Sequence, residues 1–468
     1  MDGLECSEIN RSELERTLRI DSEFYSKSAI KVSDMLQSRS HDLLTTFVNV
    51  SDGNHMGISD YFIDEGVPYY RGQDAGAFFI ENSNPICIDE KTFELPVMKR
   101  SHLKKGDVIL SIVGTIGSLS LVYSDKSATC SCKLAILRPK EGKNAELLAT
   151  FLRGKYGQAQ ITRFTRGAVQ KGLILEDMDQ LVVPVFGDGI VEAIRNAIQS
   201  AYQIQEKANN CYREAQRTLV NSVGSISVPA ESVSVRNIST SFYTTGRLDA
   251  EYYQPKYDAL FTALSTIKTK KLGGAHGIVN IEKSIEPGSE VYVEDGIPFV
   301  RVSDVSKFEI SEPEVKLRND ILPNPEVLFP QKDTILLSKD GSVGIAYKTE
   351  STMPVITSGA LLHLTVRNKA EVLPDYLTLV LNSPIVQLQA ERDSNGAIIQ
   401  HWKPSEIENA IIPVLDMDIQ KEIATKVQES FALRKQSKQL LEYAKQAVEM
   451  AIEQGEDVAM EWLKDKVN

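Results

Sequence analysis

The heptapeptide RIDSEFY at residues 19–25 returns almost unchanged as RLDAEYY at residues 247–253, which is 228 positions further along the chain. The segment GVPYYRGQD at residues 66–74 likewise returns as GIPFVRVSD at residues 296–304, with an offset of 230. Three further blocks repeat in the same order: DVILS-x-x-GTIG (107–117) as DTILL-x-x-x-GSVG (333–344), GAVQ (167–170) as GAI (396–398) with Gln400, and VVPV (182–185) as IIPV (411–414). Ordered matches at a near-constant offset predict a tandem duplication of roughly half the chain.

Each copy is expected to begin with a mixed α/β domain, because its short β-branched and aromatic runs are bounded by Gly, Pro, Asn and Asp. After Asp188, and again after Asp416, apolar residues recur at steps of three and four, which predicts a long amphipathic helix with the aspartate as N-cap. One such seam could simply pack on its own domain, but two matched seams favour pairing of the helices. The seam residues assigned to these helices as partner-binding residues are Ile190, Ile194, Ile198, Ile204, Ile423, Val427, Phe431 and Leu441.

Composition limits the class of protein. The 468 residues are 42% hydrophobic and carry a net charge of −12, which suits several folded domains but, taken alone, argues against a partner as acidic as DNA. No run approaches ~18 consecutive apolar residues, and the first residues are too polar for a signal peptide, so a soluble, cytoplasmic protein is expected. The five cysteines favour reduced thiols over a disulfide framework.

Sequence motifs for catalysis are missing. The chain has no G-x-x-x-x-G-K-[ST] loop, no G-x-G-x-x-G segment between a strand and a helix, and no H-E-x-x-H. Cys130 and Cys132 have no second pair of ligands to complete a zinc site, so buried thiols are the simpler interpretation. The Gly-Thr-Ile-Gly of residues 114–117 could hold an anion on its amides, although a tight turn is favoured. We therefore expect no catalytic and no metal-binding residues.

The net charge conceals an uneven distribution. The first 97 residues carry eight basic and eighteen acidic side chains, whereas residues 98–171 carry fourteen basic and four acidic ones, a net +10. The corresponding stretch of the second copy, residues 328–403, balances seven against seven. Such polarisation in the first copy is typical of a protein with one phosphate-binding face, although ordinary solvated surface would explain the second copy equally well.

Several polar residues near glycine-rich turns are suited to contact DNA. Arginine and lysine pair well with guanine or phosphate, and glutamine pairs with adenine. Solvation and turn capping are alternative roles for each of them. The candidates in the first copy are Arg71, Gln73, Lys133, Arg163, Arg166, Gln170 and Lys171. Those in the second copy are Arg301, Ser303, Lys339, Gln400, Trp402 and Lys403, and His401 lies between Gln400 and Trp402 in the same polar stretch.

As an ordered and duplicated set, these motifs resemble one family, the specificity (S) subunits of type I restriction-modification systems. KKGDVILSIVGTIG (104–117) with PQKDTILLSKDGSVG (330–344), and RGAVQKGLILEDMDQLVVPV (166–185) with NGAIIQHWKPSEIENAIIPV (395–414), complete the resemblance, which covers nearly the whole chain. It implies an α+β protein with target recognition domains at residues 1–187 and 225–415. Each domain is followed by a spacer helix, at residues 188–224 and 416–468, and the two helices pack as an antiparallel coiled coil.

The resemblance also implies partners. Each target recognition domain would read one half of a split double-stranded DNA site, and two DNA adenine methyltransferase subunits would clamp onto the helices and bring S-adenosylmethionine. A restriction or translocation subunit would complete the complex, while this chain would itself hold no cofactor and touch no membrane. A helix of ~33 residues spans ~50 Å, more than one turn of DNA at ~34–36 Å, so helix length is expected to act as a ruler for the unread spacer.

Two rival functions remain. The chain could itself be a nuclease or methyltransferase, which incubation with DNA, magnesium and S-adenosylmethionine would reveal. It could instead be a helical scaffold or docking protein with degenerate DNA-recognition domains, which a DNA footprint with the methyltransferase present would distinguish.

Overall fold

A computed structural model describes residues 7–80, 85–167, 171–224, 233–396 and 399–467. The chain divides into two compact units. The first unit consists of residues Met1–Gln205 together with Lys435–Asn468, and the second consists of Glu206–Arg434. Each unit therefore contains one α/β domain together with one part of each long helix.

The α/β domain of the first unit is built on an antiparallel four-stranded sheet in the order β2-β9-β6-β7. Every residue of its central strand β6 is buried, as expected for a strand covered on both faces. The sheet strands are β2 (Val48–Asp52), β9 (Leu134–Pro139), β6 (Val108–Ser111) and β7 (Leu119–Leu121); a smaller sheet contains β3 (Phe62–Ile63), β5 (Cys87–Ile88), β4 (Val67–Tyr70) and β8 (Thr129–Cys130), and β1 (His41–Leu43) pairs with β10 (Val182–Pro184).

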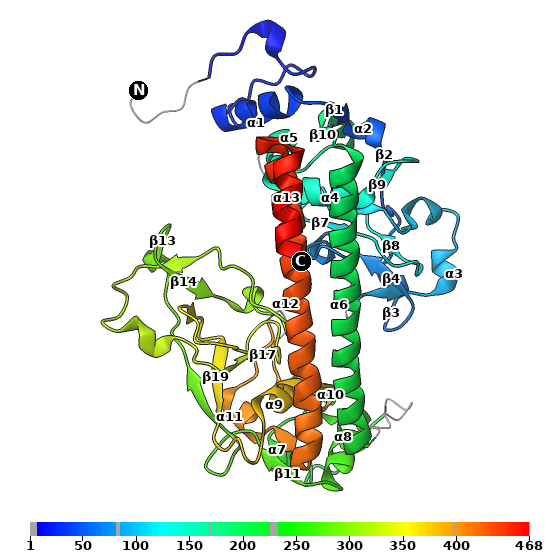
Figure 1. Ribbon diagram of the computed structural model, residues 1–468. Helices are drawn as coiled ribbons and strands as arrows, with labels where there is room; N and C mark the ends of the chain where they lie inside the picture. Colours follow the sequence, from blue (N-terminus) through cyan, green and yellow to red (C-terminus); the bar gives the residue numbers. More distant parts are fainter. Residues whose placement is uncertain (1–6, 81–84, 168–170, 225–232, 397–398, 468) are drawn as a thin grey trace. The chain divides into compact units, whose positions relative to one another are not determined.

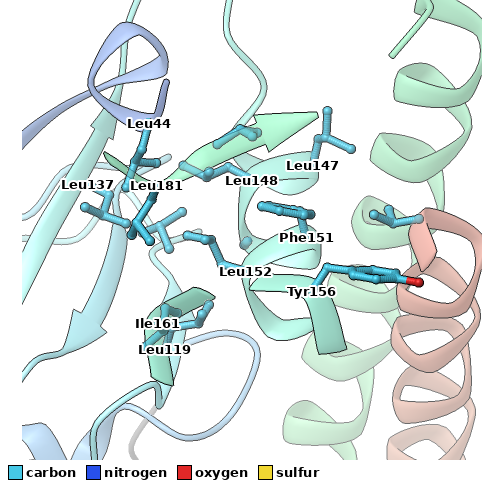
Figure 2. Packing of buried hydrophobic residues seen from close by; sticks show 14 of the residues in the cluster. Leu44, Leu119, Leu137, Leu147, Leu148, Phe151, Leu152, Tyr156, Ile161 and Leu181 are labelled. Carbon is cyan, nitrogen blue, oxygen red and sulfur yellow. The ribbon is translucent and has the colours of Figure 1, made fainter. Parts of the chain in front are cut away.

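Helices complete this domain and bring part of its core against the long helices. Figure 2 shows Leu148 and Leu152 of α4 packed near Leu137 of the sheet, while Tyr156 of α5 points toward a neighbouring long helix. The hydroxyl of Tyr156 donates a hydrogen bond to Glu453 Oε1 at 2.7 Å. The helices are α1 (Lys27–Gln37), α2 (Leu44–Phe47), α3 (Glu90–Phe93), α4 (Ala145–Arg153) and α5 (Lys155–Phe164).

The second unit repeats this domain strand for strand. Its main sheet has the order β12-β19-β16-β17, and the smaller sheet has the order β13-β15-β14-β18. The strands are β11 (Thr269–Lys271), β12 (Val279–Lys283), β13 (Tyr292–Val293), β14 (Ile297–Val300), β15 (Lys316–Leu317), β16 (Ile335–Ser338), β17 (Ala346–Lys348), β18 (Ile356–Thr357), β19 (Leu361–Val366) and β20 (Ile411–Pro413); the helices are α7 (Phe242–Thr245), α8 (Pro255–Ser265), α9 (Pro374–Leu381), α10 (Pro384–Asp393) and α11 (Pro404–Asn409). The predicted α+β class with two sheet-containing domains and long helices is confirmed.

The long helices are α6 (Asp188–Val223) and α12 (Met417–Gln454), and α13 (Glu456–Val467) follows α12 (Figure 1). In the first unit, Ser437 Oγ donates to the carbonyl of Ala201 at 2.8 Å. In the second unit, Ser430 Oγ donates to the carbonyl of Ala208 at 2.7 Å. Thr218 of α6 reaches Glu422 of α12 at 3.0 Å, so residue numbers rise along one helix as they fall along the other. The pairing is antiparallel within this unit, while supercoiling remains a prediction.

The C-terminal helical region differs from the single helix expected over residues 416–468. Gly455 has a φ of +101°, a conformation that favours glycine, and it separates α12 from α13. Within the first unit, the carboxylate of Glu456 then accepts a hydrogen bond from the backbone amide of Gly187 at 2.9 Å, next to the start of α6.

The apolar seams of α6 and α12 are largely enclosed by their own units, which corrects their assignment as partner-binding residues. Ile190, Ile194 and Ile198 are buried in the core of the first unit, and Ile423 and Val427 in that of the second. An outside subunit cannot reach these five side chains. Three seam residues, Ile204, Phe431 and Leu441, are only half-buried. None of the described helices is long and apolar enough to cross a membrane.

Candidate nucleic-acid interface

Hydrogen bonds in the first unit gather four loops that are far apart in the sequence. We call this assembly loop platform 1; it consists of residues 71–74, 112–117, 131–133 and 166–172, of which 168–170 lie outside the described residues. The amide of Ile112 donates to the carbonyl of Lys133 at 3.0 Å, and the amide of Leu173 donates to the carbonyl of Ile112 at 2.9 Å. Thr115 Oγ1 donates to the carbonyl of Gly72 at 3.0 Å. Three of the loops are therefore joined through their backbones, and the loop 71–74 is joined to them by the Thr115 hydroxyl.

The second unit builds an equivalent assembly, loop platform 2, from residues 301–304, 339–344, 358–360 and 395–403, of which 397–398 lie outside the described residues. The amide of Lys339 donates to the carbonyl of Ala360, and the amide of Trp402 donates to the carbonyl of Lys339, at 2.9 and 2.8 Å. The amide of Gly341 donates to the carbonyl of Gln400 at 2.9 Å. Most of the DNA-binding candidates of each copy thus share one platform.

Glycines shape the turn that each platform shares. Gly114 and Gly117 have φ values of +84° and +87°, and their counterparts Gly341 and Gly344 have +74° and +85°. A side-chain amide holds the second glycine in both copies: Gln158 Nε2 donates to the carbonyl of Gly117 at 3.0 Å, as Gln387 does to that of Gly344 at 2.7 Å. The amide of Gly117 donates to the carbonyl of Ser111. Residues 114–117 are therefore a tight turn, and this amide already has a partner.

The cations of loop platform 1 are mostly accessible. Lys133 is exposed. Lys171 lies 3.3 Å from Glu23, but both side chains are more than half exposed, so this ion pair is weak. Arg71 contacts Asp74 at 3.4 Å and Gln73 is exposed beside it. Arg166 is held more firmly, because its guanidinium donates to Asp177 at 2.7 Å. The candidate Gln170 lies outside the described residues.

The cations of loop platform 2 have acidic neighbours. Lys339 is only 13% exposed and its ammonium pairs with Asp340. Arg301 lies 3.6 Å from Asp304 and 3.8 Å from Glu314. Lys403 is exposed but lies 3.7 Å from Glu406. Ser303 donates to Asp304 at 3.2 Å, and Gln400 is exposed, with its amide donating to the carbonyl of Gly396 at 2.7 Å.

Trp402 was expected at the DNA surface, and this prediction is wrong. Its side chain is 0% exposed and belongs to the core of the second unit. The residue at the same place in the first copy is Leu173, which is 3% exposed and also lies in its core. Both residues anchor the platform loop that precedes them. A buried tryptophan contributes a large apolar surface to the core, and at this position it cannot stack on a base.

Arg163 is also a structural side chain rather than a free DNA contact. Its Nε donates to the carbonyl of Phe24 at 3.0 Å, and its guanidinium lies 4.3 Å from the centre of the Phe24 ring. Burial lowers the pKa of Arg163. Arg392 takes the corresponding position in the second copy, 4.9 Å from the ring centre of Tyr252.

These contacts give the RIDSEFY and RLDAEYY motifs a function that the sequence alone did not indicate. Arg19 pairs with Asp21 at 2.8 Å and donates to the carbonyl of Thr165 at 3.4 Å, where the platform loop leaves α5. Arg247 pairs with Asp249 at 2.6 Å and donates to the carbonyl of Asp393 at 3.2 Å, at the end of α10. Each motif therefore fastens the base of a platform loop. The only sign of this role in the sequence was that the motif recurs at a near-constant offset in both copies.

In their described residues, the two platforms lack the side chains of a metal site. In the described part of the chain, no three His, Cys, Asp or Glu side chains gather in a way that could hold a metal ion. Cys130 is fully buried, and this burial raises the pKa of its thiol. The thiol is accordingly protonated and behaves as a small apolar side chain.

Comparison with known proteins identifies part of the chain. Residues 265–443 match the family model described as "Type I restriction modification DNA specificity domain". The chain contains a type I restriction-modification DNA specificity domain. For residues 265–443, this match confirms the family predicted from the repeated motifs. The matched residues include the whole of loop platform 2.

Three solved structures are similar to the chain at low identity. They are the type I restriction-modification S subunit from M. genitalium (15% identity, TM-score 0.36, covering 91% of this chain and 95% of that one), the HsdS subunit from Thermoanaerobacter tengcongensis (14%, 0.28, 91% and 95%), and a chain from a study of complex assembly and conformational transition of the type I R-M system (14%, 0.28, 91% and 96%). Because these TM-scores are low, the domain match carries the assignment. A search of curated proteins gave no significant match.

Proposed function

We propose that this chain is the non-catalytic DNA-reading subunit of a type I restriction-modification complex, and that it recognises a bipartite double-stranded target. Residues 1–187 and 225–415 act as target recognition domains, and residues 188–224 and 416–468 as spacer helices. One observation carries the proposal: a matched specificity domain contains a loop platform whose main backbone hydrogen bonds recur in the other copy. Two platforms on two homologous domains suit two half-sites.

The proposed partners follow from what the chain lacks and from what it repeats. Two DNA adenine methyltransferase subunits, one for each copy, would supply S-adenosylmethionine and methyl transfer, and a restriction or translocation subunit would join the complex in the cytoplasm. The chain is acidic overall, with a net charge of −12, so much of the phosphate neutralisation is expected from these partners.

Different side chains of the platforms would contact different parts of the DNA, the phosphates or the base edges. Exposed lysines such as Lys133 and Lys171 would contact phosphates, which fix the register of the protein on the duplex. Gln73, Arg71 and Gln400 would face base edges, because amide and guanidinium groups form paired hydrogen bonds with adenine and guanine. Trp402 is excluded from this set because it is fully buried, and Arg163 because it is half-buried and held by the carbonyl of Phe24.

The test is to co-express the chain with the type I methyltransferase subunit from its own genome and to map adenine methylation by single-molecule sequencing. We expect one bipartite methylated motif that disappears when this chain is omitted. A methylation pattern that does not depend on the chain, or has no sequence motif, would contradict the proposal. Lengthening α6 and α12 by whole turns should lengthen only the unread spacer of the motif, and an unchanged spacer would refute the ruler.

A further inference from the structure

One backbone feature is common to both platforms. In loop platform 2, His401 and Asn395 exchange two hydrogen bonds, at 2.7 Å from the His401 amide and 3.0 Å from the Asn395 amide. In loop platform 1, Gly172 and Arg166 exchange the same two bonds at 2.7 and 2.8 Å. Both pairs are related by the repeat offset of 229 residues. The two copies therefore hold position 401 and position 172 in the same way, but only one of them carries a side chain there.

The backbone around His401 is fixed on both sides. The carbonyl of the preceding residue, Gln400, accepts a hydrogen bond from Gly341, and the amide of the following residue, Trp402, donates to Lys339. The indole of Trp402 is fully buried and anchors this end of the loop. A side chain at position 401 is therefore presented from a rigid base, which lowers the entropic cost of using it in recognition.

The imidazole itself is oriented by a carboxylate. Nδ1 of His401 lies 2.8 Å from Asp340 Oδ1, and the other carboxylate oxygen of Asp340 pairs with Lys339. Burial alone would raise the pKa of Asp340, but the hydrogen bonds from Lys339 and His401 outweigh it and lower that pKa, so the carboxylate stays ionised at neutral pH. The His401 side chain remains 58% exposed. With Nδ1 engaged, Nε2 is the nitrogen left for an external partner.

The fold does not require this arrangement. In the first copy, Val113 occupies the place of Asp340 and forms a backbone bridge with Gly172, as Asp340 does with His401. The same framework thus forms without the imidazole and without the carboxylate. The pair of polar side chains is added to an unchanged framework at the base of a platform loop, where His401 is bridged to Asn395, and this points to a role in binding.

We propose that His401 reads a base edge in the half-site bound by the second unit and that Asp340 is its positioning residue. This inference rests on the proposed function. A protonated imidazole would donate from Nε2 to N7 or O6 of guanine, and a neutral one would accept from the amino group of adenine or cytosine; both edges lie in the major groove. The identity of the affected base in the experiment distinguishes these two forms.

The first experiment removes the side chains in the complete complex with the methyltransferase and maps the methylated motif. His401→Ala should make one position of one half-site degenerate, with discrimination there falling on the order of tenfold, and leave the other half-site unchanged. Asp340→Asn should weaken discrimination at the same position, and the double variant should be no worse than His401→Ala alone, because Asp340 acts through His401. Asp320→Asn is the matched control, since Asp320 pairs with Arg318 in an exposed ion pair outside the platform.

The second experiment adds the missing side chain to the first copy. A Cβ on Gly172 would meet its nearest neighbour, the carbonyl oxygen of Ile112, at 3.5 Å, an ordinary contact, so Gly172→His should fold. We expect Gly172→His to change the preference at one position of the other half-site, while Gly172→Ala leaves the motif as it is. This gain does not depend on any loss of stability.

The outcomes distinguish failure of the proposed function from failure of the proposal for His401. If the unaltered chain produces no sequence-specific methylation, the proposed function fails. If it produces a motif but His401→Ala and His401→Gln both leave every position unchanged, the proposal for His401 is overturned. The same holds if Asp340→Asn and His401→Ala affect different positions. Thermal unfolding of each complex shows whether a variant has folded, and His401→Gln replaces His401→Ala if the latter has not.

Discussion

Loop platform 1 leaves its lysines accessible, whereas loop platform 2 surrounds its cations with carboxylates. Lys133 and Lys171 are exposed on the first, while Lys339 on the second is 13% exposed and paired with Asp340. The main backbone hydrogen bonds beneath these side chains nevertheless recur in both copies. The duplication therefore separates two kinds of residue: those repeated in both copies maintain the framework, and those that differ on it are free to determine how each unit meets DNA.

The strongest test of the shared framework is the loop anchor. Trp402→Ala should lower the free energy of unfolding of the second unit by about 3–5 kcal/mol, because it leaves a large cavity in a closed core. Calorimetry of the whole chain would measure this loss. Leu173→Ala in the first unit is the matched control, with an expected loss of about 2–5 kcal/mol. Trp402→Phe should retain DNA affinity; a large drop in affinity without a change in stability would mean that the indole contacts DNA.

The second prediction concerns acid. Burial lowers the pKa of His363 in β19 to about 4, from an ordinary value near 6.5, and the ring bonds Thr357 at 2.8 Å. Since the unfolded chain binds this proton more tightly, stability falls as the pH drops from about 6.5 to 4, by roughly 3 kcal/mol at most. The aligned position in β9 is Ile136, which cannot be protonated.

Acid should therefore unfold the second unit before the first. Unfolding midpoints measured between pH 7 and pH 4 would show this, and a His363→Ile variant should lose the difference. If the second unit of the variant remains equally acid-sensitive, another buried group is responsible and His363 is not the cause.

How much of this contrast the sequence could predict depends on the residue. The strands and long helices follow from spacing, because a period of two or of 3.6 specifies which face is buried. The two matched seams also indicated that the long helices contact each other, whereas their antiparallel direction was implied by the family resemblance. Trp402 was misplaced because it stands among Gln400, His401 and Lys403, which read as a polar loop. Its counterpart Leu173 shows that the position belongs to the core, so aligning the copies residue by residue was more informative than local composition.

The sequence predicted which segments are basic, but not which charged side chains contact one another. The net +10 of residues 98–171 indicated that the first copy is the more basic, and Lys133 and Lys171 are exposed as expected. The partner of Lys339 is its neighbour in the sequence, Asp340. The carbonyl that holds Arg163, in contrast, belongs to Phe24, 139 residues away, so the loss of this side chain as a free cation could not be read from spacing. The same reason hid the pair formed by Asp340 and His401, which are 61 residues apart.

The third prediction tests the charge contrast itself. Replacing Lys133 and Lys171 by glutamine should reduce the DNA affinity of the complex by about tenfold and lower the slope of log affinity against log salt by about 0.9 for each phosphate that is no longer neutralised. Lys403→Gln in the second unit should have a smaller effect, roughly twofold, because Glu406 already offsets its charge. Fluorescence anisotropy over a salt series would measure both. Equal slopes for the two sets of variants would contradict the division of labour between the platforms.

The smallest expected effect concerns the helix contacts, where the two units should behave alike. The pair Ser430–Ala208 in the second unit corresponds, by the offset of 229, to the pair Ala201–Ser437 in the first, and each serine hydroxyl donates across the helices at 2.7 or 2.8 Å. Ser430→Ala and Ser437→Ala should each cost about 1 kcal/mol, since the carbonyl that loses this donor is not left unpaired within its helix. Chemical denaturation would compare them. A clear inequality would mean that the copies have diverged in the framework as well as on the platforms, and the repeat could then no longer serve as an internal control for which residues read DNA.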